Sequence, residues 1–210
     1  MIFFASLLSF FGIQIMILSA EAIIPKYIEK NHSQLQIIHG AIIMSFTEVS
    51  GLIVSPIIGI ILEKLGRKNI VVSGFAILAF GTLGLGLCNF IPGKSTLTGD
   101  YIFFGLAVLC RFIQGVGDQF VSIAFYSILS STFPDSRERI LGFIETAAGL
   151  GLMVGPLMGG PMNVIFGYVT CYMIFTSFLV LMTILDFCLL PTSLNAKPVV
   201  TEQEFKEVVK

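Results

Sequence analysis

Residues 59–68 read Gly-Ile-Ile-Leu-Glu-Lys-Leu-Gly-Arg-Lys, a charged segment at the junction of two long apolar runs. The run before the charges covers residues 37–62, and the run after them covers residues 70–91. Each run is long enough to cross the hydrocarbon core of a bilayer as a helix, which takes about 20 apolar residues. The segment therefore predicts a tight, charged turn between two membrane-spanning helices.

Four further apolar runs flank this pair. They cover residues 2–24, 101–131, 140–162 and 165–190. Most of the six runs are bounded by proline, glycine or charged residues, but the signal between the last two is weak, so we expect a tight connection there. Only 12% of the residues are charged, about half the share of a typical soluble domain. We predict an all-α membrane protein, with a six-helix bundle over residues 1–191 and a polar linker or tail over residues 192–210.

The first run has a second interpretation as a cleaved signal peptide, because residues 19–22 loosely resemble a small-residue cleavage site. However, residues 2–20 contain no basic segment, and the apolar stretch continues to Ile24 before a proline. We therefore favour a transmembrane helix.

The basic residues outside the runs are divided unequally between the two sides of the membrane. One side holds eight of them, namely Lys64, Arg67, Lys68, Arg137, Arg139, Lys197, Lys206 and Lys210. The other side holds three, namely Lys26, Lys30 and Lys94. Because basic loops stay in the cytosol, we expect cytosolic termini and a multi-pass protein of a vesicle, another endomembrane or the plasma membrane.

The composition argues against several functional classes. The net charge is −1 and no basic cluster is present, so nucleic acid is not an expected partner. The four cysteines lie inside apolar runs without metal-ligand spacing, and His32 and His39 belong to no metal or hydrolase motif. We therefore expect no metal, no cofactor and no enzymatic activity. A channel is disfavoured because no filter-like loop or ring of acidic residues is present.

The run over residues 101–131 contains polar residues that a bilayer normally excludes. Arg111, Gln114 and Asp118 are spaced at i, i+3 and i+7, so they share one face of a helix. A charge in the middle of a membrane costs on the order of 3 kcal/mol at insertion, so it should face a cavity or a partner. An internal ion pair that only holds helices together is the simpler alternative.

Two other runs carry small residues at every fourth position. These are Ala147, Gly151, Gly155 and Gly159 in one run, and Thr47, Gly51, Ser55 and Gly59 in the other. Such ridges allow another helix backbone to approach closely. Pro156 permits a kink beside the first ridge, and Gly160 extends its small-residue end.

Three of these features resemble motifs of the major facilitator superfamily. Residues 59–68 are similar to its loop signature Gly-x-Leu-Ala-Asp-Arg-x-Gly-Arg-Lys, with glutamate in place of the aspartate and lysine in place of the first arginine. Residues 111–117 and 155–160 resemble its fourth-helix motif and its Gly-Pro-x-x-Gly-Gly exchanger motif. The resemblance implies one six-helix half of a transporter, built as a 3+3 repeat. It also implies a gating loop formed by Gly59, Glu63, Gly66, Arg67 and Lys68.

Within the superfamily, the vesicular amine and polyamine transporter branch is the most similar. The likeness rests on residues 23–26, 141–146 and 149–151. The acidic residue that monoamine members carry early in the first helix is not evident at residues 12–14. This departure argues against a monoamine and leaves a polyamine or another organic cation as the expected substrate class.

Acidic residues inside the runs supply the candidate chemistry. Burial in a low dielectric disfavours a charged carboxylate and a nearby arginine favours it, so a carboxyl group between these effects can bind and release a proton. We expect the lining for proton coupling or cation binding to comprise Glu21, Glu48, Arg111, Gln114, Asp118 and Glu145. Glu21 has an alternative, because it could reach water near the end of its helix, and Asp186 is expected to reach water in the same way.

These features predict a secondary transporter that works by alternating access and exchanges a small organic cation for protons across the bilayer. A second six-helix half, in the same chain or in a partner chain, should face the small-residue ridges and the charged loop. The alternative is a six-helix membrane scaffold or truncated gene product that transports nothing.

Overall fold

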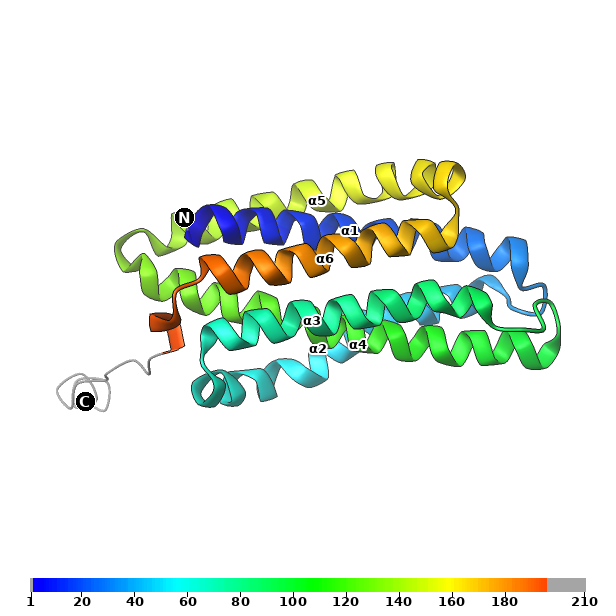
Figure 1. The fold of residues 1–210 in the computed structure, drawn as a ribbon, viewed down its shortest axis with the longest axis horizontal. Coiled ribbons are helices and arrows are strands. Elements are labelled where there is room, and N and C mark those ends of the chain that lie inside the picture. The colour runs from blue at the N-terminus through cyan, green and yellow to red at the C-terminus, as the bar shows by residue number, and fades with distance from the viewer. Residues whose placement is uncertain (1, 196–210) are drawn as a thin grey trace.

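The computed structural model describes residues 2–195, apart from the side chains of Glu63 and Ser193, as a bundle of long helices (Figure 1). The long helices are α1 (Ile2–Asn31), α2 (Ile37–Leu65), α3 (Arg67–Leu87), α4 (Leu97–Thr132), α5 (Arg137–Phe166) and α6 (Tyr168–Leu189). Three short 3₁₀ helices follow α3, α4 and α6, namely η1 (Cys88–Phe90), η2 (Pro134–Ser136) and η3 (Thr192–Asn195).

All six long helices have the length and hydropathy of membrane spans, and residues 2–195 contain no strand. The predicted all-α fold with six spans is therefore confirmed. The predicted polar tail falls largely on residues 196–210, which lie outside the described residues.

The helices pack in an exchanged pattern that reflects two repeats of three. Helix α1 packs along α5, and α4 packs along α2, so the first helix of each repeat lies beside the second helix of the other repeat. Helix α3 packs against both α4 and α6 and joins the two groups. In Figure 1, α1, α5 and α6 accordingly lie above α2, α3 and α4.

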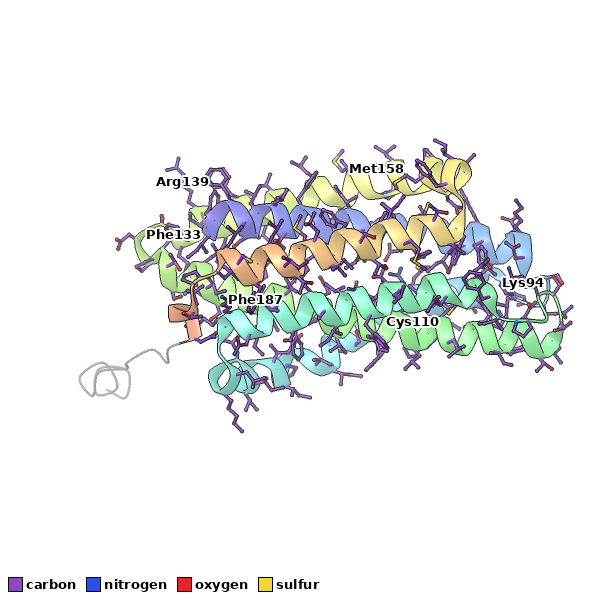
Figure 2. All side chains as sticks on the ribbon, in the orientation of Figure 1. Lys94, Cys110, Phe133, Arg139, Met158 and Phe187 are labelled. Atoms are coloured by element: carbon purple, nitrogen blue, oxygen red, sulfur yellow. The ribbon has the colours of Figure 1, made fainter. Side chains whose placement is uncertain are left out.

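The two ends of the bundle differ in what they carry. Ile2, η3, the α2–α3 turn and the α4–α5 connection lie at one end, which we call the terminal end, and the other three connections lie at the opposite end (Figure 1). Figure 2 labels Arg139 at the terminal end and Lys94 at the opposite end. At 1.5 Å per residue, α4 is about 54 Å long, so it extends well beyond a hydrocarbon core of about 30 Å.

Two helix boundaries differ from the prediction. Helix α1 continues through Pro25 to Asn31, because Pro25 is exposed while Tyr27 and Ile28 beyond it are buried against the bundle. The turn between α5 and α6 is a single residue, Gly167, with φ of +78°. The connection is therefore tight, as expected, but residues 159–161 lie inside α5 rather than at its end.

The small-residue ridge of α5 is closed by α1 of the same bundle. A Cβ atom built on Gly151, Gly155 or Gly159 would lie 2.7, 2.7 or 2.5 Å from atoms of α1. Ser19 of α1 also donates a hydrogen bond from Oγ to the carbonyl oxygen of Gly155 at 2.8 Å. The prediction that this ridge faces a second bundle is wrong, because residue spacing identifies a packing face but not the helix that occupies it.

The ridge of α2 is closed along only part of its length. A Cβ atom on Gly51 would lie 2.9 Å from Nε2 of Gln119 in α4, and Ser55 Oγ donates to Gln119 Oε1 at 3.2 Å. Nothing lies within 4 Å of a Cβ atom on Gly59. Only the end of this ridge near Gly59 is therefore open to another partner.

Candidate functional site

Polar side chains follow one side of α4 through the middle of the bundle. Arg111, Gln114, Asp118 and Tyr126 are spaced close to whole helical turns. The motif reasoning identified the first three, whereas Tyr126 belongs to no motif. Helix α4 packs against α2 and α3 along its length and contacts α1 and α5 through individual side chains. The polar side chains of α4 can therefore meet groups from four other helices.

Arg111 is the most enclosed charge on this side of α4, with 0% of its surface exposed. Its Nη1 donates to Oε1 of Gln114 at 3.3 Å, and its Nη2 lies 2.8 Å from Sδ of Met44 in α2. Nη2 also lies 3.7 Å from a carboxylate oxygen of Glu21 in α1. Gln114 in turn donates to Oγ1 of Thr82 in α3 at 2.8 Å. A buried charge is costly unless it is paired and hydrogen-bonded, and here Glu21 is the paired carboxylate.

Asp118 does not form the ion pair with Arg111, although both lie on the same side of α4. Its Oδ1 atom is buried without a hydrogen-bond partner among the described residues. Glu48 of α2 is close enough to interact electrostatically with both Asp118 and Glu21. The acidic groups of α1, α2 and α4 are therefore near enough to influence one another's charge.

Glu145 of α5 continues this set toward the terminal end. Its Oε1 accepts the hydroxyl hydrogen of Tyr126 at an oxygen–oxygen distance of 2.5 Å. Glu48 and Glu145 are both exposed on this chain, which corrects the expectation that they are buried. They are exposed because α2 and α5 are edge helices, each packed mainly along one neighbour.

Glu21 does not lie near the end of its helix, as its alternative interpretation assumed. Because α1 continues to Asn31, Glu21 lies almost three turns before the end of the helix. Its side chain is 36% exposed while it pairs with Arg111. Glu21 is thus both open to a ligand and held by a fixed cation.

We name this set the acidic row, and it consists of Glu21, Glu48, Asp118 and Glu145. Among the described side chains, Arg111 is the one guanidinium within 4 Å of a carboxyl group of the row. Arg67 and Arg137 line a pocket with Tyr126, the partner of Glu145, but form no ion pair with the row. A surface with this balance attracts cations and disfavours anions. The arrangement can therefore bind a cation, a proton or both in turn.

The charged loop lies at the terminal end of the bundle. Gly66 has φ of +85° and is the only residue between α2 and α3. Arg67 donates from Nη1 to Oγ of Ser131 near the end of α4, and Lys68 is only 7% exposed. The side chain of Glu63 lies outside the described part of the chain. The loop thus contacts other helices of the same bundle through Arg67 and Lys68.

Two buried acids lie outside the acidic row, namely Asp100, which belongs to no motif, and Asp186, which was expected to reach water. Asp100, at 0% exposure, lies 2.7 Å from Nδ1 of His32 and accepts backbone N–H groups from Gln34 and Ser95. Asp186 is 1% exposed and accepts the hydroxyl of Ser9, so the expectation that it reaches water is wrong. Both acids join segments far apart in the sequence, which local spacing does not reveal.

No group of three or more histidine, cysteine, aspartate or glutamate side chains within residues 2–195 could hold a metal ion. All four cysteines, which lie in this part of the chain, are free thiols.

Comparison with known proteins adds an independent line of evidence. A profile of the Major Facilitator Superfamily matches residues 2–209. The MFS-type transporter SLC18B1 of Homo sapiens is 30% identical over 140 residues, which cover 67% of this chain and 29% of that protein. The multi-drug resistance efflux pump PmrA of Streptococcus pneumoniae is 29% identical over 157 residues, which cover 74% of this chain and 36% of the pump.

A third relative is the synaptic vesicular amine transporter of Homo sapiens. It is 26% identical over 110 residues, which cover 51% of this chain and 19% of that protein. The chain thus spans about a third or less of the length of the curated relatives it matches.

Proposed function

Because this chain belongs to the major facilitator superfamily, we propose that it is one six-helix half of a secondary transporter that exchanges a small organic cation for protons. The second half is supplied by further residues of the same protein or by a partner chain, and transport proceeds by alternating access between the halves. The observation that carries this proposal is the acidic row, whose three partly open or exposed carboxyl groups come from α1, α2 and α5.

The balance of charge favours a cationic substrate. A carboxylate inside a membrane is costly, so such residues are kept where they line a pathway or bind a partner. Glu48 and Glu145 have no cationic partner among the described side chains. An ammonium group bound against them supplies the missing positive charge, whereas an anion would meet like charges.

Coupling to protons follows from competition for the same carboxyl groups. A proton and an organic cation each neutralise one carboxylate, so binding of one disfavours binding of the other. Glu21 suits this exchange, because its 3.7 Å contact with Arg111 is longer than a hydrogen bond and its side chain remains partly open. Arg111 is fully enclosed, so it stays in place and keeps a positive charge beside Glu21.

We further propose that the terminal end faces the cytosol. Lys64, Arg67 and Lys68 lie at this end with Arg137 and Arg139, whereas Lys26, Lys30 and Lys94 lie toward the opposite end. Basic residues concentrate on the cytosolic side of multi-pass proteins. The membrane is that of a vesicle, another endomembrane or the cell surface.

Uptake by purified protein in liposomes tests the proposal. The protein, with every residue that its gene encodes, is reconstituted and offered polyamines, quaternary ammonium compounds and organic anions, with and without a pH gradient. We expect uptake of one or more cations that depends on the gradient, and none of the anions. Absence of any uptake by a correctly folded protein would favour a membrane scaffold instead.

A further inference from the structure

The turn between α2 and α3 lacks a side chain that could cap the new helix. Gly66 ends α2 and also occupies the N-cap position of α3, and no side-chain cap hydrogen bond comes from it. The first N–H groups of a helix have no partner within the helix, and an Asn, Asp or Ser side chain usually accepts one of them. The start of α3 therefore needs an acceptor from elsewhere.

Asn195, in the segment that follows α6, supplies this acceptor. Its Oδ1 accepts the backbone N–H of Lys68 at 3.0 Å, and its Nδ2 donates to Oδ1 of Asn69 at 3.2 Å. The fit is close, because a Cβ atom on Gly66 would lie 2.5 Å from Asn195 Oδ1. A residue 127 positions further along the chain thus serves as the cap of α3.

A second contact holds the same loop from α6. Lys68 is 7% exposed, and its Nζ lies over the ring of Phe187 at 4.9 Å from the ring centre. A lysine ammonium in this position is attracted by the aromatic face. Lys68 is therefore held twice, at its backbone by Asn195 and at its side chain by Phe187 near the end of α6.

The matching turn in the second repeat has no such contact. Gly167 lies between α5 and α6 with φ of +78°, and it likewise ends one helix and begins the next. Nothing lies within 4 Å of a Cβ atom on Gly167. The turn geometry alone therefore does not require an external cap, and the contact at Gly66 is an additional feature.

We propose that η3, which is the segment after α6, acts as a clasp that holds the charged loop, with Asn195 as its central residue. While the clasp is closed, the start of α3 is capped and Lys68 is held against Phe187. When the segment after α6 moves away, the first turn of α3 loses its cap and the loop is released. The relevance of the clasp to gating rests on the proposed transport function, but the coupling itself does not.

Residue-resolved hydrogen exchange in detergent micelles or nanodiscs tests the forward direction. In Asn195→Ala the backbone amide of Lys68 should exchange about fivefold faster or more, as expected for loss of a helix cap worth about 1 kcal/mol. Asn195→Asp keeps the acceptor oxygen, so it should retain the protection. Equal exchange at Lys68 in wild-type, Asn195→Ala and Asn195→Asp protein would overturn the proposal.

The reverse direction is tested with a pair of matched glycine substitutions. Gly66→Ala and Gly167→Ala place a Cβ atom at nearly the same positive φ, so they share the backbone strain. Only Gly66→Ala also collides with Asn195. It should accelerate exchange at Leu194, whose N–H bonds to the carbonyl of Pro191, whereas Gly167→Ala should leave this amide unchanged.

The double variant Gly66→Ala with Asn195→Ala isolates the contact. Without the Asn195 side chain, the melting temperature lost on Gly66→Ala should approach the loss on Gly167→Ala. If Gly66→Ala and Gly167→Ala lower the melting temperature equally when Asn195 is present, and Leu194 responds to neither, the clasp does not exist. These readouts need no transport, so a failed uptake experiment leaves them fully interpretable.

Discussion

The charged side chain in the middle of α4 is enclosed, whereas those on the edge helices α2 and α5 are exposed. Arg111 is completely enclosed, and its contacts with Gln114, Met44 and Glu21 are set by the packing of three helices. Glu48 and Glu145 are exposed, and neither forms an ion pair with a described side chain. An enclosed charge is fixed by the fold and supports it, whereas an exposed charge can exchange partners.

The glycines of α5 show the same contrast without any charge. Gly159 meets the backbone of Ser19 in α1, whereas nothing lies within 4 Å of a Cβ atom on Gly149. The enclosed side of the bundle should therefore respond to substitution with a loss of stability. The open side should respond with a change in binding while the fold persists.

Replacing Arg111 should have the largest effect on stability. Arg111→Leu leaves the buried Oε1 of Gln114 without its donor and removes the partner of Glu21. We expect the free energy of unfolding to fall by about 2–3 kcal/mol, measured by chemical denaturation in detergent. Uptake should be lost as well.

Arg111→Lys provides the control, since it keeps the charge but lacks the planar fork that reaches Gln114 and Met44 together. It should lie between the wild-type protein and Arg111→Leu. A leucine variant as stable as the wild-type protein would break the contrast between enclosed and open charges.

The second effect concerns the contact between α1 and α5. In Gly159→Ala the added Cβ atom would lie 2.5 Å from the carbonyl oxygen of Ser19, and such overpacking costs about 1–3 kcal/mol. Gly149→Ala should be neutral or slightly stabilising, because alanine has the higher helix propensity by up to about 1 kcal/mol. Unfolding measurements on both variants check this difference, and equal losses would contradict the packing described.

The smallest effect is expected at the junction between the two regions. Tyr126→Phe removes the hydrogen bond to the exposed Glu145. Because water can replace a donor at an exposed carboxylate, the loss should be at most about 1 kcal/mol. A larger loss in the same unfolding assay would mean that Glu145 belongs with the enclosed groups.

Much of the fold could be predicted from the sequence because hydropathy and turn residues are local signals. The six spans, the charged turn at Gly66 and the side of α4 that carries Arg111 and Gln114 all follow from spacing. The partners of these features do not. The ridge of Gly151, Gly155 and Gly159 is closed by α1, and no local pattern distinguishes this neighbour from a second bundle.

The polar contacts that were missed share one property, which is long separation in the sequence. Asp186 and Ser9 are 177 residues apart, and His32 and Asp100 are 68 residues apart. The exposure of Glu48 and Glu145 likewise depends on which helices lie at the edge of the bundle. These contacts and exposures depend on how the helices pack in three dimensions, which the positions of the apolar runs do not reveal.

The most direct test of the central claim is pH-driven uptake of an organic cation by Glu48→Gln and Glu145→Gln in proteoliposomes. Glu29→Gln is the matched control, since Glu29 is exposed on α1 outside the acidic row. Each row variant should fold with wild-type stability and lose at least about tenfold in uptake, equivalent to about 1.4 kcal/mol, while the control keeps wild-type uptake. Unchanged pH-driven uptake by both row variants, correctly folded and inserted, would contradict the assignment of the acidic row as the site of cation and proton exchange.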